Sequence, residues 1–225
     1  MTESTQTPAP PAAVGDLWQS YSSALSAAEE AEPAQSVKDL IGSADLVVLG
    51  TIVNVSVGRM IEVAPNAPSS RLQFANFDVS VTKSSGAAET LSFELPVFVN
   101  SPELEAAVRA AVDPEDSNGD GVIDDDEAAR GYDAEAVGKA YAEFWDQAVS
   151  YTIESAKQRV PAVDTLLFLR EVPTEGTYRP VNGDSIIINN AGTAEIPMRA
   201  EESSPIAVEL AGASFDALIE TVFAG

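Results

Sequence analysis

Apolar residues recur with two different spacings along this chain. Between residues 44 and 99 they alternate with polar residues or form short runs, a pattern typical of β-strands, and this pattern returns beyond residue 161. Between residues 101 and 159 they recur every three or four positions, a spacing typical of amphipathic helices. The pattern therefore predicts an α+β fold in which a helical block separates two groups of strands.

The first group contains three expected strands, at residues 47–57, 71–82 and 89–99. Gly50 interrupts a β-branched run, so we expect a β-bulge there, and Pro96 indicates a sheet edge or a bend. Along the second strand, the alternation predicts an inward-facing set that includes Leu72, Phe74, Phe77, Val79 and Val81.

The helical block begins with a strong start signal, in which Ser101 caps a helix and Pro102 occupies its first turn. A second helical stretch is expected over residues 125–159, broken near Gly131 and restarted by Asp133. Its apolar face is expected to comprise Val137, Tyr141, Phe144, Ala148 and Tyr151. Aromatic residues 141, 144 and 145 could instead form a carbohydrate-stacking patch, but helical spacing favours a place in the core.

Four strands are expected after the block, at residues 163–172, 177–181, 185–189 and 194–198, and a last helix is expected to start at Ser214. The Asn182-Gly183-Asp184 sequence is typical of a hairpin turn. Towards the N-terminus, residues 1–15 are expected to form a flexible tail. A helix is expected over residues 16–31, and Ser36 is expected to cap a second, short helix.

The economical architecture is a small antiparallel β-barrel or sheet, formed by one domain over residues 16–225, with residues 101–160 inserted between two strands. This order of elements resembles bacterial five-stranded Greek-key barrels of the oligonucleotide/oligosaccharide-binding (OB) type. The segments SADLVVLGTIVNV, TLLFLREV and SFDALIETVFAG also look like an uncharacterised bacterial extracytoplasmic domain family, from which no activity can be transferred.

The charge balance excludes several classes of function. The chain has 36 acidic and 12 basic residues, a formal charge of -24, and neither Cys nor His. A phosphate backbone requires a basic stripe, and no stripe is visible in the sequence, so nucleic acid is not an expected partner. The missing residue types exclude disulfides, Ser-His-Asp or Cys-His catalysis and the usual zinc sites. No apolar run reaches the ~18 residues that a membrane span requires.

The acidic segment from Asp116 to Glu127 has the spacing D-x-[DN]-x-[DN]-G followed by five residues and Glu. Calcium takes about 6–8 oxygen ligands, and alternate residues of a tight loop can direct their side chains to one ion. Gly121 permits the sharp turn that this loop needs. The segment resembles the EF-hand family at every diagnostic position. The resemblance implies one Ca²⁺ ion with ligands from Asp116, Asn118, Asp120, Val122 (backbone carbonyl), Asp124 and Glu127 (both carboxylate oxygens).

EF-hands usually occur in pairs that contact each other through the position that Ile123 holds here, and no second loop is found in the sequence. A single hand favours weaker binding, of the kind found in structural or extracellular sites. We therefore expect a non-enzymatic calcium-binding module with an unidentified protein partner. The single hand also favours a secreted or extracytoplasmic location. Two alternatives remain open: a binding or inhibitory barrel in which calcium is only a staple, and an acidic turn whose spacing is coincidental.

Overall fold

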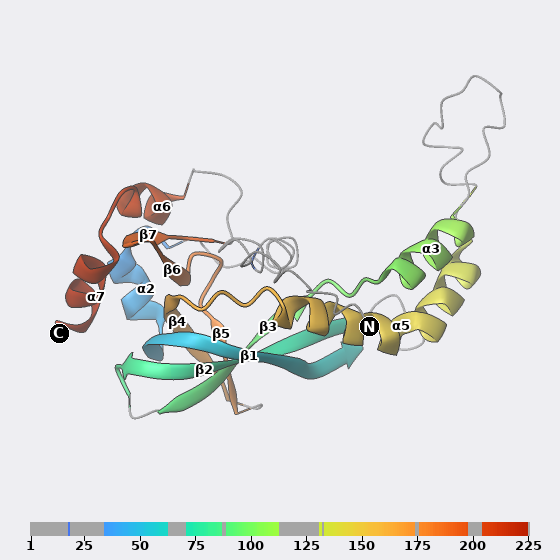
Figure 1. Cartoon of the computed structure of the whole chain (residues 1–225), viewed down its shortest axis with the longest axis horizontal. Coiled ribbons are helices and arrows are strands. Elements are labelled where there is room, and N and C mark those ends of the chain that lie inside the picture. The colour runs from blue at the N-terminus through green and yellow to red at the C-terminus, as the bar shows by residue number, and fades with distance from the viewer. Residues whose placement is uncertain are drawn as a thin grey trace, which may run out of the picture.

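The computed structural model describes residues 18, 34–62, 71–86, 89–112, 131, 133–173, 176–197 and 204–224. Within these ranges the chain forms a seven-stranded, mostly antiparallel sheet and five helices, as Figure 1 shows. The predicted α+β class is therefore confirmed. The predicted tail (residues 1–15) lies outside the described ranges, as does most of the helix expected over residues 16–31.

The three expected strands before the helical block are present as β1 (Leu46–Glu62), β2 (Arg71–Ser84) and β3 (Thr90–Val97). They pair in order and antiparallel. The β1–β2 register shifts at three places, one of them between Leu49 and Gly50, so the predicted bulge is confirmed. A Cβ on Gly50 would lie 2.5 Å from the carbonyl oxygen of Ser80, so only glycine allows the two strands to approach this closely.

The later strands complete a closed set of pairings. They are β4 (Asp164–Val172), β5 (Thr177–Pro180), β6 (Ile186–Asn190) and β7 (Thr193–Glu195). β4 pairs with β1, and β5 pairs with both β4 and β3, so β1, β2, β3, β5 and β4 form a ring of paired strands. β5 meets β3 in parallel through one residue pair, Phe93 with Tyr178, so backbone pairing contributes little to this seam.

The predicted hairpin at Asn182-Gly183-Asp184 is wrong. β1 occupies one edge of β4, and β5 and β6 both pair along the opposite edge, one after the other. Residues 181–185 therefore bulge out of a single interrupted strand. The side chain of Asn182 accepts hydrogen bonds from the Asp184 amide (3.0 Å) and the Ser185 hydroxyl (2.9 Å), which replace the missing ladder contacts.

The helices are α2 (Val37–Ser43), α3 (Pro102–Ala111), α5 (Ala134–Lys157), α6 (Pro205–Leu210) and α7 (Phe215–Phe223). The predicted starts at Ser36, Ser101, Asp133 and Ser214 are confirmed, because each of these side chains accepts a backbone N–H in the first turn. Helix α6 was not predicted, although Ser204 and Pro205 repeat the start signal found at Ser101 and Pro102.

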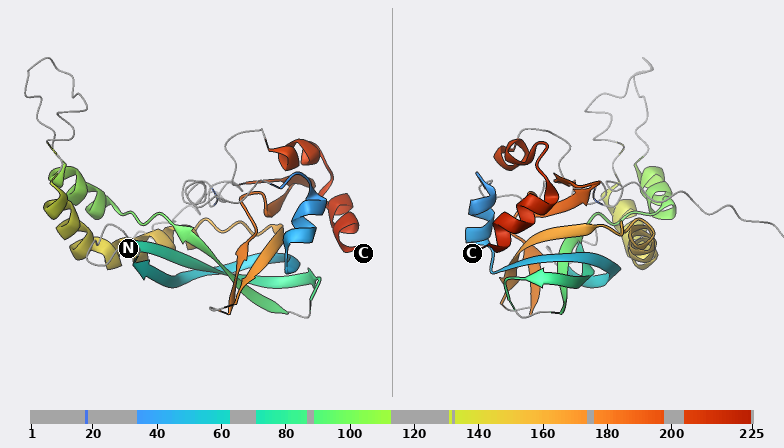
Figure 2. Two further views of the ribbon diagram at one scale, coloured as in Figure 1. Left: turned by 180° about the vertical axis from the view of Figure 1, so that it is seen from behind. Right: turned by 60° about the vertical axis from the view of Figure 1, so that its left-hand side comes forward.

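Two hydrophobic cores lie on opposite faces of the strands. In the right-hand view of Figure 2, α5 (yellow) lies to one side of the strands, and α2 (blue) and α7 (red) lie to the other. The first core lies between the strand ring and α5 and includes Phe77, Phe93, Trp145 and Ile153, with Trp18 stacked on Phe77. The second lies between β1, β4 and β6 and the helices α2, α6 and α7. Trp145 is thus a core residue, as the helical spacing favours. Tyr151 is not, because the buried face of α5 continues through Val149, Ile153 and Ala156 and leaves Tyr151 50% exposed.

Candidate functional site

The six predicted calcium ligands lie outside the residues that the structure describes, as does Ile123. These ligands are Asp116, Asn118, Asp120, Val122, Asp124 and Glu127. The structure does describe the two helices that precede and follow them, α3 and α5. These two helices determine where the chain enters and leaves the intervening segment.

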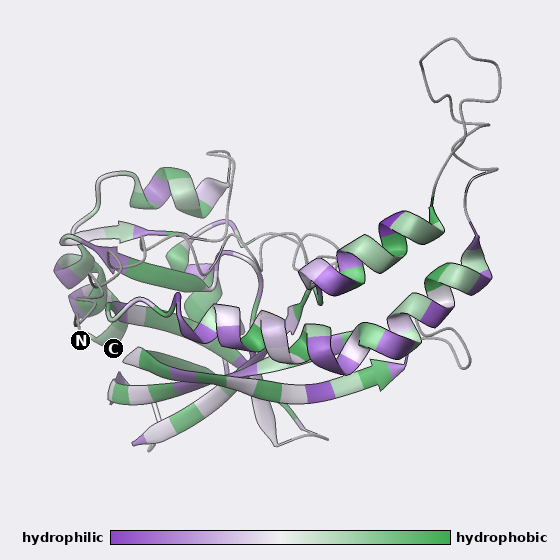
Figure 3. Ribbon diagram, turned by 45° about the vertical axis from the view of Figure 1, so that its right-hand side comes forward, coloured by the Kyte–Doolittle hydropathy of each residue, from purple (hydrophilic) through white to green (hydrophobic). Residues whose placement is uncertain are grey.

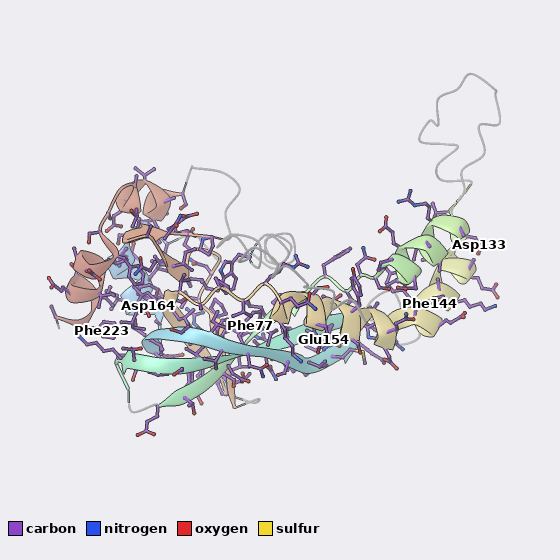
Figure 4. All side chains as sticks on the ribbon, viewed as in Figure 1. Phe77, Asp133, Phe144, Glu154, Asp164 and Phe223 are labelled. Carbon is purple, nitrogen blue, oxygen red and sulfur yellow. The ribbon has the colours of Figure 1, made fainter. Side chains whose placement is uncertain are left out.

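Helices α3 and α5 pack side by side and form an arm that extends from the strands, as Figure 3 shows. At the far end of the arm, the backbone N–H of Asp133 donates a hydrogen bond to the carbonyl oxygen of Ala111 (3.3 Å). Figure 4 places Asp133 at this end, well away from Phe77 in the first core. The chain therefore leaves α3 and enters α5 at nearly the same point.

Asp133 has a second role, because its side chain caps α5. Its Oδ1 atom accepts hydrogen bonds from the N–H groups of Glu135 and Ala136, each at 3.0 Å. At the other end of α3, the buried hydroxyl of Ser101 accepts the N–H of Leu104 (3.1 Å). Both helices thus begin at fixed residues, and one residue joins the two helices at the point where the predicted loop is attached.

At the base of the arm, the linker that follows β3 is hydrogen-bonded to α5. The linker between β3 and α3 contains Asn100, whose backbone N–H and carbonyl both hydrogen-bond to the Thr152 hydroxyl on α5, at 3.2 and 2.9 Å. Beside this contact lies a pocket of about 340 Å³, lined in part by Phe98, Tyr151 and Arg159. Phe98 is 66% exposed, so this pocket carries an exposed aromatic surface near the base of the arm.

A cluster that sequence reasoning did not find lies on the ring itself. The carboxylate of Glu94 on β3 is 2% exposed and accepts hydrogen bonds from Arg59 on β1 (2.9 and 3.1 Å) and from Arg179 on β5 (2.5 Å). Both guanidinium groups lie over the Phe74 ring, at 5.0 and 4.8 Å from its centroid. One buried carboxylate thus links the first, third and fifth strands.

This cluster corrects the predicted role of Phe74. The first core takes Ala75, Phe77 and Val79 from β2, so Phe74 faces the opposite side of the strand. Phe74 is buried at 4% exposure because the two guanidinium groups cover it, and it contributes a cation–π platform rather than a core contact. No local pattern could identify the cluster, since residues 59, 74, 94 and 179 are brought together only by the strand pairing.

Within the described ranges, the structure groups no three Asp or Glu side chains in a way that could hold a metal ion. No helix among these residues is long and apolar enough to cross a membrane. Comparisons with protein-family models, with curated proteins and with solved structures found no match to this chain.

Proposed function

We propose that this protein is a non-enzymatic calcium-binding module that holds one Ca²⁺ ion in the segment from Asp116 to Glu127. The observation that carries the proposal is the position of the motif. The complete set of EF-hand ligand positions occurs between two packed helices whose facing ends are joined by the hydrogen bond from Asp133 to Ala111. The first and last ligands of a calcium loop bind the same ion, so the chain enters and leaves such a loop at nearby points. In this arm, the end of α3 and the start of α5 lie close together.

The proposed ligands are the side chains of Asp116, Asn118, Asp120 and Asp124, the backbone carbonyl of Val122, and both carboxylate oxygens of Glu127. Four of the six residues are carboxylates, which repel one another strongly at close range unless a cation neutralises them. Calcium binding is therefore expected to order the segment between α3 and α5. It should also strengthen the link between the two helices, because metal binding to a site that forms only in the folded state stabilises that state.

We also propose that the strand ring is an OB-like barrel that carries the arm. This proposal is supported by the ring of pairings β1-β2-β3-β5-β4 and by the insertion of α3 and α5 between β3 and β4. A ring of five paired strands with a helical insertion at this place agrees with the sequence resemblance.

The test of the calcium proposal is isothermal titration calorimetry of the whole chain with Ca²⁺. We expect one site per chain with a dissociation constant of about 10⁻³ M or lower, and weaker heats with Mg²⁺, which prefers strict octahedral coordination. Glu127→Gln should abolish most of the affinity because it removes the bidentate ligand. Asp126→Asn is the matched control: it removes the same charge from the neighbouring, non-ligand position and should bind nearly as tightly as the wild type.

Two results would contradict the proposal. One is a wild-type protein that takes up no calcium at ~1 mM free ion, which would leave the motif as a coincidental acidic turn. The other is an equal loss of affinity in Asp126→Asn and Glu127→Gln, which would indicate diffuse attraction by a protein of charge -24 rather than a coordination site.

A second candidate function is a protein-binding barrel in which calcium only staples the arm. The exposed aromatic residues Phe98 and Tyr151 favour it, because they line the same pocket at the base of the arm, away from the proposed ion. Fluorine NMR of fluorotyrosine-labelled protein distinguishes the two functions. If calcium regulates binding at the base, the Tyr151 signal shifts on calcium addition. If calcium is only a staple, the Tyr151 signal stays unchanged.

A further inference from the structure

Two pockets meet at the base of the arm and share a wall. One is the pocket of about 340 Å³ described above, and the other, of about 250 Å³, lies further along α3. Phe98, Asn100 and Glu105 line both pockets, and each pocket adds one tyrosine and one arginine of its own. These residues are Tyr151 and Arg159 in the first pocket, and Tyr141 and Arg109 in the second. The same kinds of side chain are therefore presented twice, in two adjoining places.

Phe98, which both pockets share, is held facing outward. Its neighbours Val97 and Val99 are buried in the first core, at 5% and 7% exposure, so the alternation of extended backbone turns Phe98 away from that core. The hydrogen bonds between the Asn100 backbone and the Thr152 hydroxyl fix the end of this linker on α5. No stacking contact joins Phe98 to another aromatic ring in the described ranges. Its ring is thus an apolar surface that is already positioned for a ligand.

Polar side chains that line the pockets supply hydrogen-bond donors and acceptors. Asn100 and Ser155 use only backbone groups in the hydrogen bonds of the described chain, so the Asn100 amide and the Ser155 hydroxyl can bind a ligand. The carboxylate of Glu105 is 54% exposed and accepts one hydrogen bond, from Arg109 (2.7 Å). An amide, a hydroxyl and a carboxylate differ in what they donate and accept, so together they match a ligand with several hydroxyl groups.

The charges around the pockets favour a neutral ligand. A cation would approach Arg109 and Arg159, one in each pocket. An anion would approach the shared Glu105 and a chain whose formal charge is -24. A peptide would need backbone partners, yet the backbone N–H and carbonyl of Asn100 are already bonded to Thr152.

We propose that these two pockets bind two consecutive units of a neutral oligosaccharide. A pyranose unit has an apolar C–H face, which packs against an aromatic ring, and a rim of hydroxyl groups, which require donors and acceptors. Both pockets present this combination, and the repeat of one tyrosine and one arginine around the shared Phe98 matches the repeat of a sugar chain. The larger pocket falls within the size range of small-molecule sites, about 300–1,000 Å³. This site is independent of the proposed calcium loop, and a protein partner would compete for it.

The test is saturation-transfer difference NMR of the full chain in calcium-free buffer, with glucose and the neutral disaccharides cellobiose, maltose and diacetylchitobiose. We expect at least one disaccharide to bind with a dissociation constant of about 10⁻³ M or lower, because open pockets on a fixed surface give modest affinity. Glucose should bind about tenfold more weakly than that disaccharide, since it fills only one pocket. The strongest transfer should reach the ring C–H protons that pack against Phe98. Digalacturonic acid, which is negatively charged, should show no saturable binding.

Phe98→Ala should weaken binding of that disaccharide about fivefold to tenfold, because it removes the aromatic surface that both pockets share. Phe98 is 66% exposed, so its truncation should leave the fold intact, which circular dichroism verifies. Val208→Ala is the control, because Val208 is similarly exposed (67%) and lies on α6, outside both pockets. This variant should bind the disaccharide as tightly as the wild type does.

The proposal is overturned if no disaccharide in the set binds saturably, if glucose binds as tightly as the best disaccharide, or if Phe98→Ala binds like the wild type. A neutral, end-blocked pentapeptide of leucine and serine provides the comparison with a protein partner. If this peptide binds more tightly than every disaccharide, the surface belongs to a polypeptide and the oligosaccharide assignment is wrong.

Discussion

Glu94 shows how one residue can hold distant parts of this chain together. It lies at a strand position that faces away from the first core, where a solvated carboxylate would be expected, yet it is 2% exposed. Burying a carboxylate is costly unless it is paired and hydrogen-bonded, and here Arg59 and Arg179 provide both. Because β3 and β5 share only one backbone pair, the contact between Glu94 and Arg179 adds a charged side-chain link across a seam with little backbone pairing.

We predict that Glu94→Gln lowers the free energy of unfolding by about 2–3 kcal/mol. This is somewhat less than for a fully buried ion pair, because both guanidinium groups remain partly exposed to water. Glu105→Gln, which removes an exposed carboxylate paired with Arg109 on α3, is the control and should change stability by less than about 0.5 kcal/mol. Urea unfolding measures both values, and equal effects of the two substitutions would contradict the role assigned to Glu94.

At the scale of elements, the two kinds of secondary structure place opposite demands on glycine. In the β1–β2 pair, Gly50 lies where the strands approach too closely for any side chain. In helix α5, Gly138 has no atom within 4 Å of a built Cβ, so its lack of a side chain serves no packing purpose among the described residues. The same residue type therefore supports one element and weakens another.

Alanine substitutions at these two glycines should have effects of opposite sign. Gly50→Ala should destabilise the protein by about 1–3 kcal/mol, because its Cβ would meet the backbone oxygen of Ser80, which cannot move without disturbing the ladder. Gly138→Ala should stabilise it by about 0.5–1 kcal/mol, because alanine restricts the unfolded chain and favours the helix. Thermal unfolding by circular dichroism compares the two, and a destabilised Gly138→Ala protein would show that α5 has a further contact at that position.

At the scale of the whole molecule, 36 acidic residues against 12 basic ones set the response to cations. Such an excess opposes the compact state through self-repulsion, which salt screens in a non-specific way. A coordination site adds a specific term, since an ion that binds only the folded chain raises stability by RT ln(1 + [L]/Kd).

Calcium should therefore stabilise the protein more than salt of equal ionic strength does. At ten times the dissociation constant the expected gain is about 1.4 kcal/mol, a rise of a few degrees in Tm for a chain of this size. In Glu127→Gln the calcium effect should fall to the level of magnesium or sodium chloride. Differential scanning calorimetry tests this expectation, and a Tm that follows ionic strength alone, whatever the cation, would count against a coordinated ion.

Local patterns predicted most elements of this fold, because the causes of those elements are themselves local. The cap residues Ser36, Ser101, Asp133 and Ser214 start helices where the sequence indicated. Alternation located the strands to within a few residues, and the β-bulge beside Gly50 followed from one glycine in a β-branched run. Helix α6 was not predicted, although Ser204 and Pro205 give the same kind of local start signal.

Other expectations failed where the outcome depended on partners distant in sequence. The Asn182-Gly183-Asp184 turn has the composition of a hairpin, yet β4 offers one free edge to both β5 and β6, so the chain bulges instead of reversing. Tyr151 fits the helical spacing of the core, but the face that α5 buries is set by its packing against β1 and leaves this residue exposed.

The sequence by itself determined the class of fold, the places where helices begin, the acidic character and the spacing of the proposed calcium ligands. Each of these depends on residues within a few positions of one another, or on composition alone. The tertiary structure decided the closure of the strand ring, the meeting of Ala111 with Asp133, and the gathering of Arg59, Phe74, Glu94 and Arg179. These features join residues far apart in sequence, and pairing register and packing, which no local pattern encodes, bring them into contact.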